Sequence, residues 1–189
     1  MPQVPVSGNY FGTMLVKMGY ADALLGGATY STADTVRPAL QIIKTKPGSK
    51  IVSSCFIMVR PSATGENEVL AMADCAINIK PTEDELVEIA VETARTAKVF
   101  GIDPKVAFLS YSTLVPARAR TWTRCATPAR RPRLPCPTFP WTASSSSTPP
   151  CLPWWPRPST SPRSVGGHAN TFIFPDINAG NIGYKICQR

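Results

Sequence analysis

The chain before residue 114 alternates between short apolar runs and segments with helical spacing. Buried strands are predicted by the apolar runs at 21–28 (ADALLGGA), 50–59 (KIVSSCFIMV), 68–78 (EVLAMADCAIN), 105–112 (KVAFLSYS) and 170–176 (NTFIFPD). Helices are predicted at 31–44 and 82–101, and residues 178–189 predict a glycine-bearing turn that enters a helix. Strands that alternate with helices indicate an α/β fold, a parallel-sheet-based layered structure with helices on both faces.

The strongest local signal is the segment 82–101. Thr82 and Glu85 have the spacing of a capping box, and Gly101 stands where a helix would stop. Between them, Leu86, Ile89, Ala90, Ala94 and Ala97 form one apolar stripe. In the segment 31–44, Ser31 or Thr32 can cap the helix, whereas Pro38 falls later than the position that a helix tolerates best.

Composition separates residues 114–164 from the rest of the chain. The formal charge is +8, yet this window holds eight of the twenty Lys and Arg residues, all of them Arg, and none of the twelve acidic residues. It also holds twelve of the twenty Pro, all four Trp and no Gly. The remainder is formally neutral, so the basic pI is a property of this window alone.

Two positions outside this window can bind an anion. Glycines end the first predicted strand, and the next helix opens with Ser31, Thr32 and Thr35, followed by Arg37, a bidentate phosphate fork. The second position is DINAGNIGYK, where Asn178 and Asn181 offer amides, Lys185 offers charge, and Gly180 and Gly183 would allow a close backbone approach to the ligand. Together they could bind a small phosphate-bearing ligand.

Each of these residues also has a purely structural interpretation. Ser and Thr after glycine are ordinary helix caps, and Asp34 and Asp176 near helix starts complement the helix dipole. His168, the single histidine, fits a structural residue beside a strand better than a base. Cys55, Cys75 and Cys187 fit small packed hydrophobes, and the absence of a CxxC pair argues against a zinc site.

At the two anion-binding positions the sequence resembles a known family. GYADALLGGATYSTADTVRPALQIIKTKPGSKIVSSCFIMV is similar to the central part of phosphate acetyltransferases, and GGHANTFIFPDINAGNIGYKICQR is similar to a stretch before their C-terminal part. The resemblance covers 9–113 and 165–189. It implies acetyl transfer between coenzyme A and orthophosphate in acetate metabolism, in the cleft of a two-domain α/β fold, with acetyl-CoA as substrate and no metal or permanent cofactor.

The resemblance also assigns residues. Substrate binding falls to eight positions: Ser31, Thr32, Thr35, Arg37, Asn178, Asn181, Tyr184 and Lys185. It implies a homodimer at full length. The family's Ser-Arg-Gly motif and its proposed aspartate base are expected beyond Arg189, so no catalytic base is assigned and the chain as given is expected to be inactive. With neither signal peptide nor membrane span in the sequence, the expected location is cytoplasmic.

The window 114–164 has two interpretations. As protein, it would be a disordered Pro/Arg/Ser-rich arm whose Arg and Trp residues bind nucleic acid, or whose PxxP spacings bind a protein partner. As a frameshift, WTASSSSTPPCLPWW can be back-translated and read from the third base as Asp-Gly-Glu-Leu-Gln-Leu-Asp-Ala-Ala-Leu-Pro-Ala-Val-Val. This translated sequence resembles the family's sequence shortly before GHAN. We therefore expect three segments: an α/β portion at 1–113, a frameshifted segment at 114–164, and a return to the same fold at 165–189.

Overall fold

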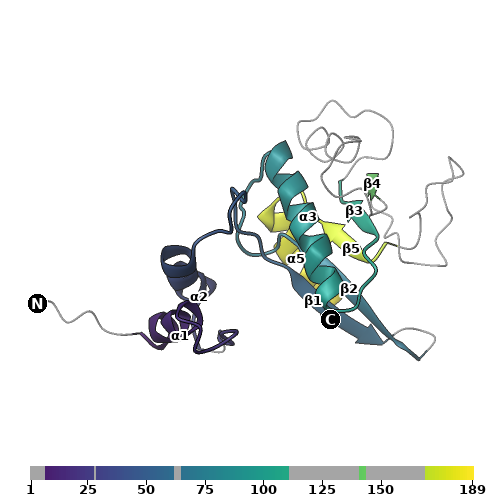
Figure 1. Cartoon of the computed structure of the whole chain (residues 1–189). Coiled ribbons are helices and arrows are strands. Elements are labelled where there is room, and N and C mark those ends of the chain that lie inside the picture. Colours follow the sequence, from purple (N-terminus) through teal and green to yellow (C-terminus); the bar gives the residue numbers. More distant parts are fainter. Residues whose placement is uncertain (1–6, 28, 62–64, 111–140, 144–168) are drawn as a thin grey trace, which may run out of the picture. The chain divides into compact units, whose positions relative to one another are not determined.

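The computed structural model describes residues 7–27, 29–61, 65–110, 141–143 and 169–189 (Figure 1). The chain divides into two compact units, Met1–Lys50 and Ile51–Arg189. Within the described residues, no helix is long and apolar enough to cross a membrane.

The first unit consists of helices. Helix α1 spans Gly8–Lys17, α2 spans Thr32–Pro38, and the π-helical turn η1 spans Ala39–Ile43. The predicted helix at 31–44 is thereby confirmed, with Ser31 as its cap. Its geometry changes at Pro38, which has no N–H to continue the ordinary helical ladder. The following turn is closed instead by a hydrogen bond between residues five apart, from Lys44 N to Ala39 O, at 2.9 Å.

The predicted strand at 21–28 is wrong. Residues 21–27 form no strand, and the side chain of Leu25 is 99% exposed. The run consists of Ala, Leu and Gly around one Asp and contains no β-branched or aromatic residue, so its intrinsic strand preference is low. The described residues of this unit also provide no other strand with which it could pair.

The second unit is built on a five-stranded sheet in the order β1-β2-β5-β3-β4 (Figure 1). The strands are β1 (Phe56–Pro61), β2 (Asn67–Ala73), β3 (Val106–Phe108), β4 (Trp141–Ala143) and β5 (Thr171–Ile173). Strands β2, β5, β3 and β4 are parallel, which confirms the parallel sheet. Strand β4 lies inside the window 114–164 and is the only described part of it.

Strand β1 departs from the parallel arrangement. It pairs antiparallel with β2, with Phe56 opposite Met72 and Pro61 opposite Asn67. The five residues between the two strands are too few for a parallel crossover, which needs a dozen or more, so a hairpin is the arrangement available. The apolar run predicted a strand that starts at Lys50, but β1 starts at Phe56.

Helices cover both faces of the sheet, as predicted. Helix α3 (Glu83–Val99) packs on one face, and α5 (Ile177–Cys187) packs on the other. The two cores separate by the alternation of side chains along each strand. On the α3 face lie Ala73, Leu86, Ile89, Ala90, Ala94, Val106, Phe108 and Ile173. On the α5 face lie Leu70, Met72, Cys75, Ala107, Ala169, Phe172 and Phe174, with Ala179, Tyr184 and Cys187 packed against them.

The start and the end of α3 confirm the local sequence signals. Thr82 accepts a hydrogen bond from Glu85 N at 3.4 Å, and the Glu85 carboxylate accepts one from Thr82 N at 2.7 Å. These are the two bonds of a capping box. After the helix, Gly101 adopts a left-handed φ of 76°, a conformation that favours glycine.

Replacing Thr82 by Ala should lower the free energy of unfolding by about 1 kcal/mol, because the Glu85 N–H loses its capping partner. Replacing it by Ser keeps the hydroxyl and should preserve most of the stability. Urea unfolding followed by circular dichroism would compare the two variants. An equal loss in both would show that the hydroxyl is not the source of the stabilisation.

Candidate functional site

In the second unit, polar residues gather at one edge of the sheet. The carboxyl ends of the parallel strands β2 and β5 lie there, followed by Asp74 and Asp176. Because β1 runs antiparallel to β2, the segment that leads into β1, with Ser54, reaches the same edge. In parallel sheets this edge is where ligands bind.

Asp74 is buried, with 2% of its surface exposed, and its carboxylate is surrounded by donors. It accepts hydrogen bonds from the backbone N–H groups of Ala76, Ile77 and Asn78 at 2.9, 3.0 and 3.2 Å. Ser54 donates through both its hydroxyl and its backbone N–H, and the Asn78 side-chain amide donates as well. The Asn78 amide also donates to Val52 O at 2.9 Å. The carboxylate thus joins the approach to β1 with the turn after β2.

Helix α5 begins earlier than expected. Its cap is Asp176, whose carboxylate accepts from Ala179 N at 2.9 Å, and the helix starts at Ile177. The prediction of a glycine-bearing turn before the helix is therefore wrong, because Gly180 and Gly183 lie inside it. Their roles are also different: a Cβ on Gly180 would lie 2.4 Å from Asp74 O, and one on Gly183 would lie 2.7 Å from the Phe174 ring. In this structure the glycines bring the helix close to the sheet.

Four of the predicted substrate-binding residues lie on α5, namely Asn178, Asn181, Tyr184 and Lys185. Asn178, Asn181 and Lys185 are spaced so that they share one side of the helix. Asn178 and Lys185 are exposed, and the Asn181 amide donates to Cys75 O at 3.4 Å. Tyr184 is partly buried and stacks on Phe56 with the ring centroids 4.4 Å apart. Its ring also lies 6.0 Å from Lys185 Nζ, within the range of a cation–π contact.

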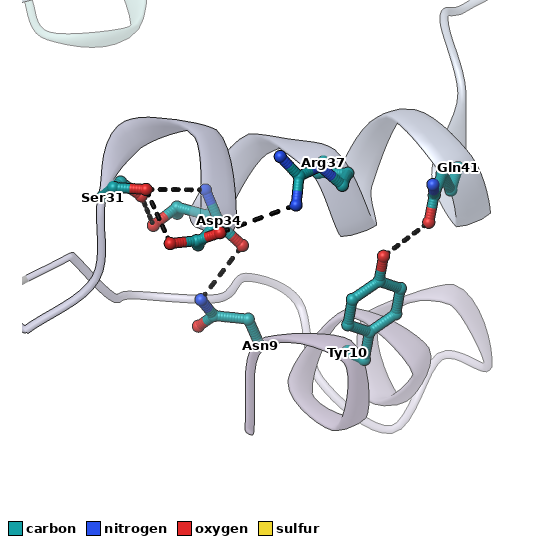
Figure 2. Close-up of polar contacts among 7 residues, drawn as sticks. Asn9, Tyr10, Ser31, Asp34, Arg37 and Gln41 are labelled. Atoms are coloured by element: carbon teal, nitrogen blue, oxygen red, sulfur yellow. Dashed lines mark hydrogen bonds and ion pairs between the residues drawn. The ribbon is translucent and has the colours of Figure 1, made fainter. Parts of the chain in front are cut away.

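In the first unit, the structure surrounds Ser31 with local bonds (Figure 2). The hydroxyl of Ser31 donates to Asp34 Oδ2 at 2.7 Å and accepts from Asp34 N at 3.2 Å. Thr35 Oγ1 donates to Ser31 O at 3.1 Å. Thr32, the first residue of α2, is exposed. The hydroxyl of Ser31 therefore caps α2, as the structural interpretation predicted, whereas the Thr35 hydroxyl only donates back to the Ser31 carbonyl.

Arg37 is exposed and only weakly paired. Its guanidinium lies 3.7 Å from the Asp34 carboxylate, and both side chains are more than half exposed. An exposed ion pair at that distance contributes little. The position of the helix that carries Arg37 is set by α1, because Asn9 donates to Asp34 O at 3.2 Å and Tyr10 donates to Gln41 Oε1 at 2.6 Å (Figure 2).

The two candidate sets belong to different units. Ser31, Thr32, Thr35 and Arg37 lie in the first, and the four residues of α5 lie in the second. Each set is brought together within its own unit. Sequence reasoning missed Asn9 and Asp74, since a lone buried polar residue has no distinctive spacing. His168 falls outside the described residues.

The thiols of the buried Cys75 and the half-buried Cys55 are poor nucleophiles. Burial raises the pKa of Cys75 from 9.0 to about 12, and the negative charge of Asp74 adds to the effect. Burial likewise raises the pKa of Cys55 to about 11. Near neutral pH both stay protonated, which agrees with their interpretation as packing residues. Among the residues that the structure describes, no group of acidic, His and Cys side chains could hold a metal ion.

Replacing Gly180 by Ala should destabilise the second unit, although alanine favours helices. The new methyl group would lie 2.4 Å from Asp74 O, so α5 must move away from the sheet. Such overpacking costs about 1–3 kcal/mol, and against backbone atoms, which cannot rotate away, we expect the upper part of this range, above the roughly 1 kcal/mol gained in helix propensity. Urea unfolding would measure the loss. Asn178→Ala, at an exposed position of the same helix, should stay within about 0.5 kcal/mol of the parent; a G180A variant as stable as N178A would contradict the close approach.

Comparisons with known proteins agree with this fold. The family model described as phosphate acetyl/butaryl transferase matches residues 3–128 and 159–189. The phosphate acetyltransferase of Bacillus subtilis is 47% identical over 181 residues, which cover 96% of this chain and 54% of that protein. The enzyme of the same name from Thermoanaerobacterium thermosaccharolyticum is 44% identical over 95% of this chain and 56% of its own length.

Solved structures give the same result. A phosphotransacetylase from Streptococcus pyogenes superposes with a TM-score of 0.78 at 46% identity and covers 96% of this chain and 54% of its own. The EutD phosphotransacetylase from Staphylococcus aureus has a TM-score of 0.74 at 40% identity. The chain spans about half the length of the relatives it matches. With the family model matching most of its residues, the chain belongs to the phosphate acetyl/butyryl transferase family.

Proposed function

We propose that this chain is part of an enzyme that transfers an acetyl group between coenzyme A and orthophosphate. The observation that carries the proposal is the 47% identity, over nearly the whole chain, to a protein named phosphate acetyltransferase. The chain covers only about half of such relatives, so the activity is proposed for the complete protein. Acetyl-CoA and phosphate are its proposed substrates, with no permanently bound cofactor.

In the direction of thioester synthesis the chemistry is a direct displacement. The thiol sulfur of coenzyme A bonds to the carbonyl carbon of acetyl phosphate while the bond from that carbon to the phosphate oxygen breaks. The thiol proton passes to a base, and inorganic phosphate leaves. Such a reaction needs groups that hold the phosphate and stabilise the charge that develops on the carbonyl oxygen. We assign no residue of this chain as the base.

Arg37 is the strongest proposed phosphate ligand. Its guanidinium is more than half exposed, and among the described residues its ion pair is the 3.7 Å contact with Asp34, so little is lost when it turns towards an anion. Its planar fork can bind two phosphate oxygens at once. We propose that Ser31, Thr32 and Thr35 line the same position. The Ser31 and Thr35 hydroxyls would have to exchange their present partners to donate to a ligand.

The second part of the proposed substrate surface is the exposed side of α5. Asn178 and Lys185 present an amide and a positive charge there, and Asn181 lies between them. Tyr184 remains a predicted substrate-binding residue, although its ring is stacked on Phe56. The proposal also includes a homodimer at full length and a cytoplasmic location.

The role of Arg37 can be tested in a protein extended to the length of the relatives and restored through residues 114–164. This protein should form acetyl phosphate from acetyl-CoA and phosphate, detected as the hydroxamate. Arg37→Ala should lower kcat/KM by about 100-fold, the scale of losing one group that stabilises transition-state charge. Arg37→Lys should recover only part of it, because an ammonium cannot form the fork.

The matched control is Arg95→Ala. Arg95 is an exposed arginine of α3 that pairs with Glu92, so its removal should leave kcat/KM unchanged. A parent protein without turnover would contradict the proposed function. Turnover that survives Arg37→Ala intact would contradict only the assignment of Arg37.

We also propose that residues 114–164 are a frameshifted reading of a segment that belongs to the same fold. The family model supports this, because it leaves out residues 129–158, which all fall in that window. The alternative is a basic Pro/Trp-rich arm that binds nucleic acid or a protein partner. No comparison favours it, and nearly all of the arm lies outside the described residues.

The coding DNA tests this proposal. Independent resequencing should show a single-base change of frame near codon 114 and a compensating change near codon 164, with a reading frame between them that restores acidic residues and glycines. A confirmed, continuous frame through those codons would contradict it. In that case, salt-sensitive binding to single-stranded DNA that is lost on deleting residues 114–164 would support the basic arm.

A further inference from the structure

We propose that Asp74 is the positioning residue for the polar side of α5, and that it acts through the turn formed by residues 75–79. The inference rests on the proposed function only where it concerns substrate binding. Its structural part, that the placement of α5 depends on the Asp74 carboxylate, stands on the geometry of the second unit alone.

The carboxylate is bound by neutral donors from two separate segments. The N–H groups of three consecutive residues, Ala76 to Asn78, converge on it within 2.9–3.2 Å. Ser54 supplies its hydroxyl and its N–H from the other side. A buried charge is unfavourable unless hydrogen bonds replace its hydration, and successive N–H groups that point inward can do so. The turn therefore keeps its shape because the charge is present.

Ser54 adds to the same arrangement. Its hydroxyl oxygen also accepts from Cys75 N at 3.3 Å and from Ala76 N at 3.1 Å. The first four N–H groups after Asp74 thus all point towards either the carboxylate or the Ser54 hydroxyl. With these groups turned inward, the carbonyl oxygens of the turn remain for other partners.

Two of those carbonyls hold α5. Cys75 O accepts from the Asn181 side-chain amide at 3.4 Å, and Ile79 O accepts from Ile177 N at 3.1 Å. A third contact comes from Asp74 itself, whose carbonyl oxygen faces Gly180. All three contacts fall on the first half of α5, between residues 177 and 181. The segment that carries Asn178 and Asn181 is therefore attached to the turn that Asp74 organises.

The opposite face of the sheet does not share this dependence. Helix α3 packs through its apolar core residues, among them Leu86 and Ile89, on the face away from α5. Loss of the Asp74 charge should therefore loosen α5 and leave α3 in place. That difference separates a positioning role from a general loss of stability.

The variant is Asp74→Asn, which replaces one acceptor oxygen by an NH2 group that faces other donors. In the 189-residue chain, amide hydrogen exchange read by mass spectrometry should speed up by at least about 10-fold in peptides covering 177–183. Peptides covering α3 should exchange as in the parent. Ser54→Ala should give a smaller effect in the same α5 peptides, and it decides the question if D74N fails to fold. Asp103→Asn, an exposed carboxylate before β3, is the matched control and should change nothing.

A kinetic measurement on the extended, restored protein tests the link to substrate. Asp74→Asn should raise the KM for phosphate or for acetyl-CoA by at least about 5-fold, with a smaller change in kcat. A variant that is merely less folded would lower the maximal rate and leave both KM values unchanged.

The outcomes are distinct. Unchanged exchange in α5, or equal acceleration in α3 and α5, would overturn the positioning role of Asp74. Turnover with both KM values unchanged would overturn its link to substrate. A parent protein without turnover would count against the proposed function, while the exchange experiment would still decide what Asp74 does.

Discussion

The close backbone contact between α5 and the end of β2 is the constraint on which the second unit depends. At Gly180 the helix comes so near to Asp74 O that no side chain fits between them. That approach places the turn after β2 within reach of Asn181 and of the helix start at Ile177. It also allows Tyr184 to stack on Phe56 and so ties the edge strand β1 to the same helix. The polar residues at the end of β2 and the apolar core on the α5 face therefore depend on the same contact.

Local sequence signals predicted the elements that are stabilised locally. Helix α3 has its cap, its apolar stripe and its terminating glycine within twenty residues, and each was recognisable from the sequence. The helices on both faces followed from the alternation of strand and helix. The run at 21–28 has the apolar composition of a buried strand, but it lacks the β-branched residues that favour one. An apolar run shows what can be buried, and it does not show whether a partner strand exists.

The candidate site shows the same division. The hypothesis that Ser31, Thr35 and Arg37 bind an anion follows from their residue types, whereas the bonds that hold Ser31 to Asp34 could not be predicted from them. The glycines of α5 were assigned to a turn because glycine normally weakens helices. The close approach of Asp74 and Phe174 to these glycines explains why the glycines lie inside the helix. The role of Asp74 could not be predicted from the sequence. Its partners Ser54 and Asn78 come close to it only once β1 and β2 form a hairpin.

The strand order has a consequence for how the chain assembles. Strand β5 lies between β2 and β3, yet it follows both in sequence and is separated from β3 by more than sixty residues. Before β5 inserts, the backbone N–H and C=O groups with which β2 and β3 pair with β5 lack their sheet partners. The connection between β3 and β5 includes β4, which pairs with β3, and the entropic cost of closing a loop grows only with the logarithm of its length. The strand at the centre of the sheet is thus the last described strand in the sequence, so the sheet can close only after residues 171–173 have been added to the chain.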